Sequence, residues 1–211
     1  MTSALPMFPL KLVVFPGERL NLHIFEPRYK QLINDCRTEQ TTFGLPAYID
    51  DQIMPVATEM IVQHVHKVYP DGKMDIRTLG KGLVRITDYQ SELEGKLYGG
   101  AAATRMEIDL IGDIKKNIAL LKLVRKLHKL MDIRKSLPGK TDHGITYKLG
   151  HHVGLNMQQE FALLEITQES DRQDYLIEHL TRLIPIVHEM NALREKVQMN
   201  GHFRNILPPD V

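Results

Sequence analysis

The chain has 211 residues, which corresponds to one large domain or two small ones, and its 43% apolar and 25% charged residues are typical of a globular protein with a packed core. Its formal net charge of +1 gives no reason to expect a nucleic-acid or membrane partner, and its single cysteine, Cys36, excludes an intramolecular disulfide. The sequence contains no apolar run long enough to span a membrane and no charged start of a signal peptide, so we expect a cytoplasmic protein.

The first predicted elements are a strand followed directly by a helix. Apolar and polar side chains alternate over residues 19–25, which predicts a half-buried strand. Pro27 fits the first position of a helix, where its missing N–H does no harm. That helix is predicted to bury one face, made of Tyr29, Leu32, Ile33 and Cys36.

Further short strands are predicted up to residue 106. Residues 59–80 are expected to form a hairpin whose turn lies at Pro70-Asp71-Gly72. Three other segments carry strand patterns, namely residues 41–49, 82–90 and 97–106. Strands at this spacing predict a small barrel or a folded sheet.

The second half of the chain has helical spacing of its apolar residues. Helices are predicted over residues 107–134, over residues 145–154, and after Asn156 as an N-cap. Ser170-x-x-Gln173 has the form of a capping box at the start of a long helix, whose apolar stripe runs from Leu176 to Val197. We therefore expect an α+β protein with a β-subdomain over residues 1–105, an α-helical bundle over 106–200 and a tail over 201–211.

Residues 137–141, LPGKT, copy the end of a nucleotide-binding P-loop. The full motif needs a glycine where this chain has Arg134, and it should follow a strand, whereas a helix is predicted here. The segment is therefore predicted to be an ordinary loop between helices.

The ten histidines suggest a metal site only weakly. His64 and His66 would lie on one face of a strand, whereas the adjacent His151 and His152, with His143 nearby, would diverge on a helix. The sequence has neither a cysteine pair nor a His-Glu-x-x-His motif, so we expect no metal and no cofactor. A metal or enzyme site at His64, His66 or residues 23–29 is the competing hypothesis.

Residues 23–29, HIFEPRY, combine an imidazole, a carboxylate, a guanidinium and a phenol. Each has a structural role at a strand-to-helix corner, such as a pair between Glu26 and Lys30, and the stretch supplies no partnered acid and base. Cys36 lies on the apolar helix face, where a thiol behaves as a small apolar side chain. We assign no catalytic residue and expect that the protein is not an enzyme.

The predicted helix around residues 115–135 is strongly basic. It could contact a phosphate backbone, although no aromatic side chain lies among its cations to stack on bases. An intramolecular or solvated role is preferred, because an acidic segment follows later in the chain. The cations are Lys115, Lys116, Lys122, Arg125, Lys126, Lys129, Arg134 and Lys135.

Three stretches together resemble the Lon-protease N-terminal domain, also called the Lon substrate-binding domain, and especially its standalone bacterial versions. The first is residues 5–33, LPMFPLKLVVFPGERLNLHIFEPRYKQLI, with its prolines, Gly17 and the Phe-Glu-Pro-Arg-Tyr corner. The others are residues 68–86, VYPDGKMDIRTLGKGLVRI, and residues 163–184, LLEITQESDRQDYLIEHLTRLI.

The resemblance implies a PUA-like β-barrel followed by an α-helical bundle. It also implies a non-catalytic module that binds unfolded or partner polypeptides, as an adaptor or a chaperone-like factor in protein quality control, without the ATPase and protease modules of full Lon proteases. No binding residues can be transferred position by position, so the binding surface is left open, with an exposed apolar patch or groove expected near the barrel–bundle junction. RNA binding through the barrel and the basic helix is the alternative.

Overall fold

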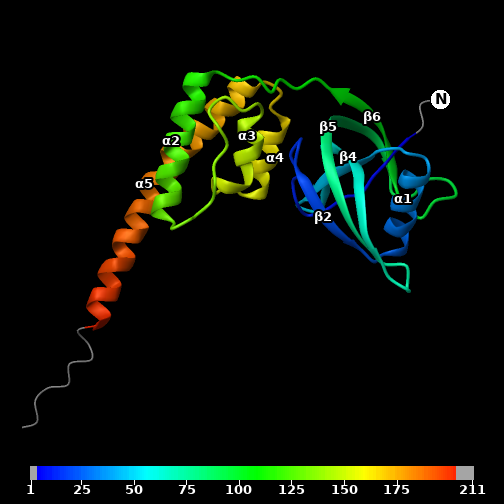
Figure 1. Cartoon of the computed structure of the whole chain (residues 1–211), viewed down its shortest axis with the longest axis horizontal. Coiled ribbons are helices and arrows are strands. Elements are labelled where there is room, and N and C mark those ends of the chain that lie inside the picture. Colours follow the sequence, from blue (N-terminus) through cyan, green and yellow to red (C-terminus); the bar gives the residue numbers. More distant parts are fainter. Residues whose placement is uncertain (1–3, 203–211) are drawn as a thin grey trace, which may run out of the picture.

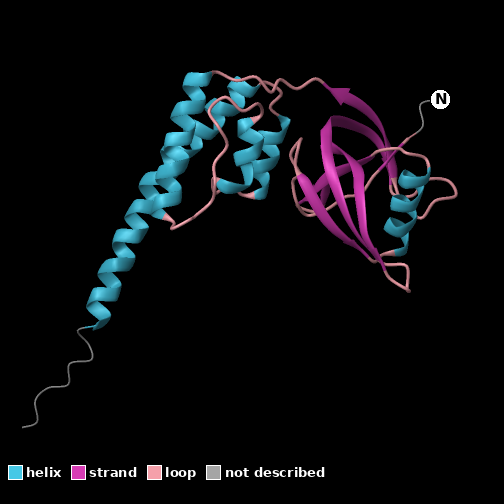
Figure 2. Cartoon of the chain, in the orientation of Figure 1, coloured by secondary structure: helices cyan, strands magenta, loops and turns pink. Residues whose placement is uncertain are grey.

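The computed structural model describes residues 4–202, with side chains up to Gln198, so most of the predicted tail lies outside the described part. Strands form the first part of the molecule and helices the second, as Figures 1 and 2 show. The predicted α+β class is therefore confirmed. Within residues 4–202, no helix is long and apolar enough to cross a membrane.

The strands form one antiparallel sheet that curls into an incomplete barrel. Its order is β1-β6-β5-β4-β3, and β2 pairs with the first part of β5. Two parallel bridges, Met7 to Gly44 and Leu10 to Ala47, join the segment after β1 to β3. The strands are β1 (Leu5–Pro6), β2 (Arg19–Ile24), β3 (Phe43–Ile49), β4 (Gln52–Val68), β5 (Met74–Gln90) and β6 (Gly100–Met106).

Two predictions about the first half are confirmed. The hairpin of β4 and β5 turns at Pro70-Asp71-Gly72, where Gly72 has a positive φ of 77° and donates its N–H to Tyr69. The helix α1 (Pro27–Thr38) begins at Pro27 and buries the predicted face of four side chains against the barrel. The local pattern was sufficient in both places because the signals, a proline at the helix start with helical apolar spacing and a Pro-Asp-Gly turn, are local in the sequence.

In the described residues up to 202, four α-helices and one 3₁₀ turn follow the barrel. Helix α2 lies alongside the first part of α5, and the rest of α5 projects away from the barrel (Figure 1). The capping box predicted from Asn156 is present at the start of α4. The elements are α2 (Ile114–Leu130), α3 (Ile145–Leu149), η1 (Gly150–His152), α4 (Met157–Glu165) and α5 (Glu169–His202).

The predicted start of α2 at residue 107 is wrong. Residues 107–113 are not helical, and α2 begins only after Asp113, whose carboxylate caps it by accepting the N–H groups of Lys115 and Lys116. Ile114 and Ile118 fit the predicted stripe but are exposed. The buried residues of α2 include Asn117, Leu120, Leu121, Val124 and Leu127.

The predictions for the start and the outer half of α5 are also wrong in detail. Gln173 does not close a capping box on Ser170; its amide binds the main chain of Asp113 and the side chain of Asn117. The apolar stripe is buried only as far as Ile184, because the helix then extends beyond its neighbours. Of the later members of the stripe, Val187 is partly buried against the core, whereas Met190, Leu193 and Val197 are exposed.

One apolar cluster spans the barrel and the helices, and two further clusters lie within the barrel part. Phe15, Val56 and Leu83 of the barrel pack in the same cluster as Val124 of α2 and Tyr147 of α3. The boundary between residues 105 and 106 remains a proposal, since the elements change from strands to helices there but one apolar cluster extends across it.

A buried ion pair orders the inner end of the helical part. Arg172 and Glu169 of α5 have essentially no exposed side-chain surface, and Nη2 lies 2.7 Å from Oε2. Arg172 also donates to the hydroxyl of Thr146 and to the carbonyls of Ile166 and Asp109, while Glu169 accepts the N–H and O–H of Thr146. The pair therefore ties α5 to α3 and to the segment that enters from the barrel.

We predict that Arg172→Ala lowers the free energy of unfolding by about 3–5 kcal/mol, because it leaves the Glu169 carboxylate buried without its partner. The matched control is Arg182→Ala on the exposed part of the same helix. Its side chain is 71% exposed and its guanidinium lies 3.5 Å from Glu178, so we expect the free energy of unfolding to fall by less than about 1 kcal/mol. Urea denaturation of both variants gives the comparison, and equal losses would contradict the role assigned to the pair.

Candidate functional site

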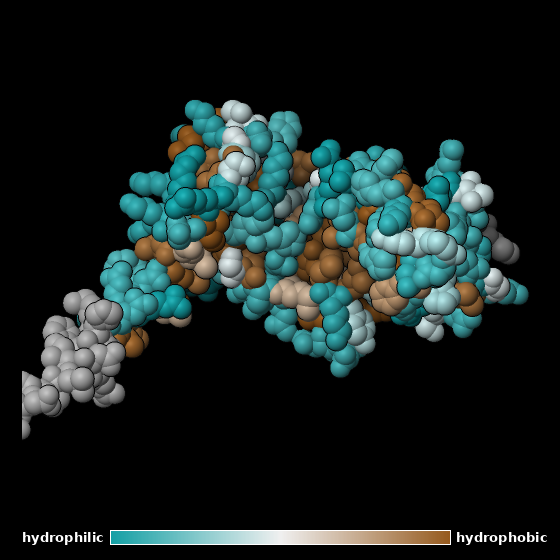
Figure 3. Space-filling view, turned by 60° about the horizontal axis from the view of Figure 1, so that its bottom comes forward, coloured by the Kyte–Doolittle hydropathy of each residue, from teal (hydrophilic) through white to brown (hydrophobic). Residues whose placement is uncertain are grey.

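A cavity of about 620 Å³ lies where the barrel meets the helices, and we call it the junction groove. It lies between barrel loops, the connecting segment and the short helices. Figure 3 shows that apolar surface is exposed along the boundary between these two parts of the molecule. The groove is lined by Pro16, Gly17, Glu18, Gly80, Lys81, Ile108, Leu110, Lys135, His143, Gly144, Tyr147, Lys148, His151 and His152.

Glycines set the barrel wall of the groove. Gly17 has a positive φ of 83°, and it exchanges main-chain hydrogen bonds with β5 together with its neighbour Glu18. A Cβ on Gly80 would lie 2.8 Å from the carbonyl oxygen of Phe15, so only glycine lets the loop lie this close to the strand. The loop in turn places Phe15 against Tyr147, with ring centroids 5.4 Å apart.

The opposite wall depends on the connecting segment. Gly144 has a positive φ of 59° and donates its N–H to the carbonyl of Leu110 at 2.8 Å. The carbonyl of Asp109 accepts from the buried Arg172, and the Arg172 guanidinium stacks 4.1 Å from the Tyr147 ring centroid. The buried ion pair therefore fixes both the segment and the aromatic ring that line the groove.

His151 joins the barrel to α4 at one edge of the groove. Its Nδ1 lies 2.7 Å from Glu160, and its Nε2 lies 3.1 Å from Glu18, which also accepts the N–H of Phe15. Burial lowers the pKa of His151, but the hydrogen bonds and charges of the two carboxylates outweigh it and raise the pKa to about 9. At neutral pH the ring is therefore an imidazolium held between two carboxylates.

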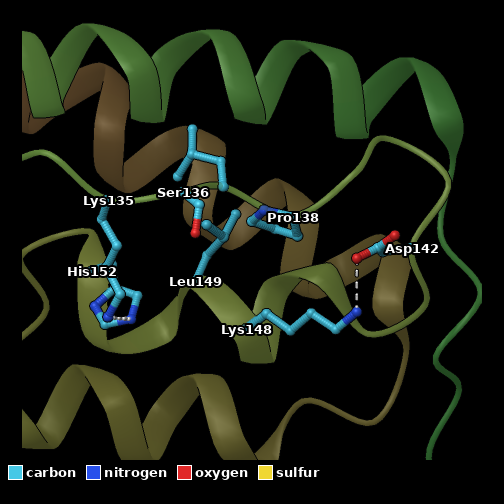
Figure 4. Close-up of a pocket in the computed structure, with 8 residues that line it drawn as sticks. Lys135, Ser136, Pro138, Asp142, Lys148, Leu149 and His152 are labelled. Atoms are coloured by element: carbon cyan, nitrogen blue, oxygen red, sulfur yellow. Dashed lines mark hydrogen bonds and ion pairs between the residues drawn. The ribbon is translucent and has the colours of Figure 1, made fainter.

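A smaller pocket of about 270 Å³ adjoins the groove (Figure 4). It shares Lys135, Lys148 and His152 with the groove. Lys148 pairs with Asp142 at 2.9 Å, and the Lys135 ammonium lies 2.6 Å from Nε2 of His152. Burial and the Lys135 charge lower the pKa of His152, so its neutral ring can accept from the lysine.

The groove therefore combines an apolar floor with a cationic rim. Ile108, Leu110 and Tyr147 supply apolar surface, and Lys81 and Lys135 supply charge. This combination suits an apolar segment that carries an acidic group.

The sequence-predicted metal candidates are only partly brought together. His143, His151 and His152 all line the junction groove, but His64 and His66 lie elsewhere, on β4, with their rings 4.8 Å apart. Among residues 4–198, no group of three possible ligands is close enough to hold a metal ion. Sequence reasoning missed Glu18 and Glu160 as partners of His151, and their spacing carries no signal for this contact.

The P-loop-like stretch lies in the loop between α2 and α3, as predicted. It does not follow a strand, and Leu137 and Pro138 only line the smaller pocket. The carbonyl of Lys140 accepts a hydrogen bond from Asn117 of α2. The loop is therefore a connection that is fastened to a helix.

The HIFEPRY corner is held by local pairs. Glu26 binds Arg28 at 2.8 Å, and the Arg28 guanidinium lies 4.5 Å from the centre of the Tyr29 ring. The predicted pair of Glu26 with Lys30 is wrong, because the Lys30 ammonium binds the carbonyl of Asp71 in the hairpin turn. The first two contacts order the start of α1, and the bond of Lys30 to Asp71 fastens the helix to the β4–β5 turn.

The basic helix is partly neutralised within the fold. Lys116 pairs with Asp174 at 2.6 Å and also binds Ser170, as expected for contact with the acidic segment. Lys122, Lys126 and Lys129 lie on the exposed side of α2.

We predict that the contribution of His151 to stability disappears at high pH. Its folded pKa of about 9 lies above the ordinary 6.5, so the contribution is complete below pH 6.5 and is lost as the pH rises through 9. The substitution His151→Gln should therefore lower the free energy of unfolding by at most about 3 kcal/mol at pH 6 and by much less at pH 9.5. Urea denaturation at the two pH values measures this loss, and His66→Gln, at an exposed position, is the control. A loss of unfolding free energy that does not change with pH would contradict the prediction.

We predict that the Cys36 thiol is unreactive in the folded protein. Burial raises its pKa to about 11, so little thiolate forms at neutral pH. A chromogenic disulfide reagent should react with it at least about a hundredfold faster in denaturant than in buffer at pH 8. Rapid reaction in buffer would show that the thiol is accessible.

Comparison with known proteins supports the resemblance seen in the sequence. The family model of the ATP-dependent protease La (LON) substrate-binding domain matches residues 4–182. A search of curated proteins found no match.

Solved structures with the same fold include two Lon N-terminal domains. One is a Lon N-terminal domain protein from Xanthomonas campestris, with 23% identity, a TM-score of 0.65, and coverage of 83% of this chain and 98% of that one. The other is the N-terminal domain of the Mycobacterium avium complex Lon protease, with 14% identity, a TM-score of 0.62, and coverage of 85% and 98%. At these identities the two structures show the fold alone, and the family model, which matches most of the chain, shows that the protein belongs to the Lon substrate-binding domain family.

Proposed function

We propose that this protein is a non-catalytic module that binds polypeptide segments in the junction groove, as an adaptor or a chaperone-like factor in cytoplasmic protein quality control. The observation that carries the proposal is the groove itself, a cavity of about 620 Å³ with an apolar floor and a cationic rim. The family supports a substrate-binding role, since its description refers to the binding of substrates.

The shape and chemistry of the groove favour a flexible polypeptide over a small ligand. Its floor is made of ordinary apolar side chains such as Ile108 and Leu110, which contact many apolar partners without strict geometry. Its lysines contact carboxylates as point charges and set no fixed orientation. Binding of this kind recognises the amino-acid composition of a segment and not its exact sequence. An adaptor for unfolded chains requires this.

We predict that Leu110→Glu weakens polypeptide binding at least tenfold, because a carboxylate replaces apolar surface in the floor of the groove. Ile111→Glu is the matched control, since Ile111 is the next residue, is 69% exposed and does not line the groove. Fluorescein-labelled, reduced and carboxymethylated lactalbumin serves as the unfolded probe, and its anisotropy gives the affinity. Equal affinity of the two variants would reject the groove as the binding site.

The RNA alternative is tested in the same assay. Labelled polyuridine at low salt should bind weakly or not at all, and the combined variant Lys122→Glu, Lys126→Glu and Lys129→Glu should leave lactalbumin binding within about twofold of the original. Salt-dependent polyuridine binding that this variant abolishes would instead favour the basic helix and an RNA partner.

A further inference from the structure

A second surface of the barrel, the outer edge of β6, has unpaired main-chain groups. On one side β6 pairs with β5 over most of its length, but on the other side β1 pairs only with Gly100 and Ala101. Among residues 4–202, no strand pairs with this outer edge from Ala102 to Met106. In Figure 1 the end of β6 lies at the rim of the barrel.

The ladder with β1 shows which groups point outward. Met7 donates its N–H to the carbonyl of Gly99 at 2.9 Å, and Leu5 lies opposite Ala101. Main-chain groups alternate in direction along a strand, so Ala103 and Arg105 continue the outward series. Ala102 and Thr104 point the other way, toward their partners on β5.

A cleft of about 750 Å³ runs along this edge. Its walls are Ala102–Arg105 of β6 and the segment just before β3, which includes Thr41 and Thr42, and Ala4–Pro6 also line it. Val84 lines it from β5, and Glu59 lines it from β4. The cleft therefore has a donor and acceptor edge on one side and space beside it for side chains.

The edge lacks the usual features that prevent pairing with another chain. Exposed edge strands commonly carry lysine, proline or a bulge. Here Ala102, Ala103 and Thr104 are exposed, small and uncharged, and the one charged residue, Arg105, has its guanidinium 3.1 Å from Glu59 across the cleft. Among residues 4–202, this short edge is thus left without a partner strand.

The charge of the cleft is opposite to that of the junction groove. Glu39 and Glu94 line it, and neither has an ion-pair partner among the residues that the structure describes. The nearby Lys96 is already paired with Asp35 at 2.7 Å. The two free carboxylates favour a partner with basic side chains.

We propose that the outer edge of β6 binds an extended polypeptide segment with basic side chains, which adds to the sheet as a strand antiparallel to β6. Main-chain hydrogen bonds to Ala103 and Arg105 would continue the ladder that β1 begins, and basic side chains would meet Glu39 and Glu94. This inference rests on the proposed polypeptide-binding function but concerns a site separate from the junction groove. The rival occupant is the chain's own terminus, since three residues precede Ala4.

Hydrogen exchange of the full chain, followed by NMR, tests the proposal without a substitution. The probe is the synthetic heptapeptide Thr-Lys-Val-Lys-Val-Lys-Thr. Its addition should slow exchange of the Ala103 and Arg105 amides at least tenfold and leave those of Ala102 and Thr104 unchanged. Unaltered exchange at Ala103 and Arg105 would overturn the proposal, and so would protection already complete in the free protein, which would indicate occupation by the chain's own terminus.

A pair of variants tests the proposed binding at this edge independently. Ala103→Pro removes the outward N–H and leaves the bonds to β5 in place, so heptapeptide affinity should fall at least tenfold. Ala103→Ser has a similar size and keeps the N–H, so its affinity should stay within twofold. Equal affinities of the two variants would overturn the proposal, and if Ala103→Pro fails to fold, the hydrogen-exchange result decides.

Leu110→Glu separates the two sites. Heptapeptide affinity should be unchanged in this variant even if lactalbumin binding is lost. The opposite result would be loss of heptapeptide binding in Leu110→Glu together with unaltered hydrogen exchange at the Ala103 and Arg105 amides. That result would overturn the proposal and leave the junction groove as the sole binding site.

Discussion

The buried ion pair of Arg172 and Glu169 is the interaction on which the arrangement of the helical part depends. Taking two charges out of water is costly, and the cost is offset here because the charged groups are hydrogen-bonded to each other, to Thr146 and to main-chain carbonyls. The same guanidinium stacks on Tyr147, which in turn stacks on Phe15 of the barrel. A continuous series of contacts therefore runs from α5 to the barrel, and the junction groove lies beside it.

The two candidate binding surfaces differ in physical character, and this bears on how an adaptor could hold an unfolded chain. The junction groove offers apolar contact and cations, with the imidazolium of His151 joining Glu18 to Glu160 at its edge. The edge of β6 offers main-chain hydrogen bonds and carboxylates. Neither mode requires one particular sequence. Once one site holds part of an unfolded polypeptide, the effective concentration of the rest of that polypeptide at the other site rises.

Much of the fold could be predicted from the sequence, since α1, the β4–β5 hairpin and the cap at Asn156 are set by neighbouring residues. The start of α2 could not, because Gln173, 60 residues away, binds the main chain of Asp113, and Arg172 binds the carbonyl of Asp109 in the segment before it. The site was less predictable still. A charged residue such as Arg172 is expected at the surface, although here it is buried. The contact of His151 with Glu18 joins residues 133 positions apart, and no periodic pattern in the sequence indicates it.

The central claim is that unfolded polypeptides bind in the junction groove, and photocrosslinking tests it most directly. Lactalbumin carrying a benzophenone group is bound to the protein, irradiated, and the attached peptides are identified by mass spectrometry. We predict that most crosslinks fall at residues 16–18, 80–81, 108, 110, 135, 143–144, 147–148 and 151–152, which line the groove. Crosslinks concentrated on the exposed side of α2, or spread evenly over the surface, would contradict the claim.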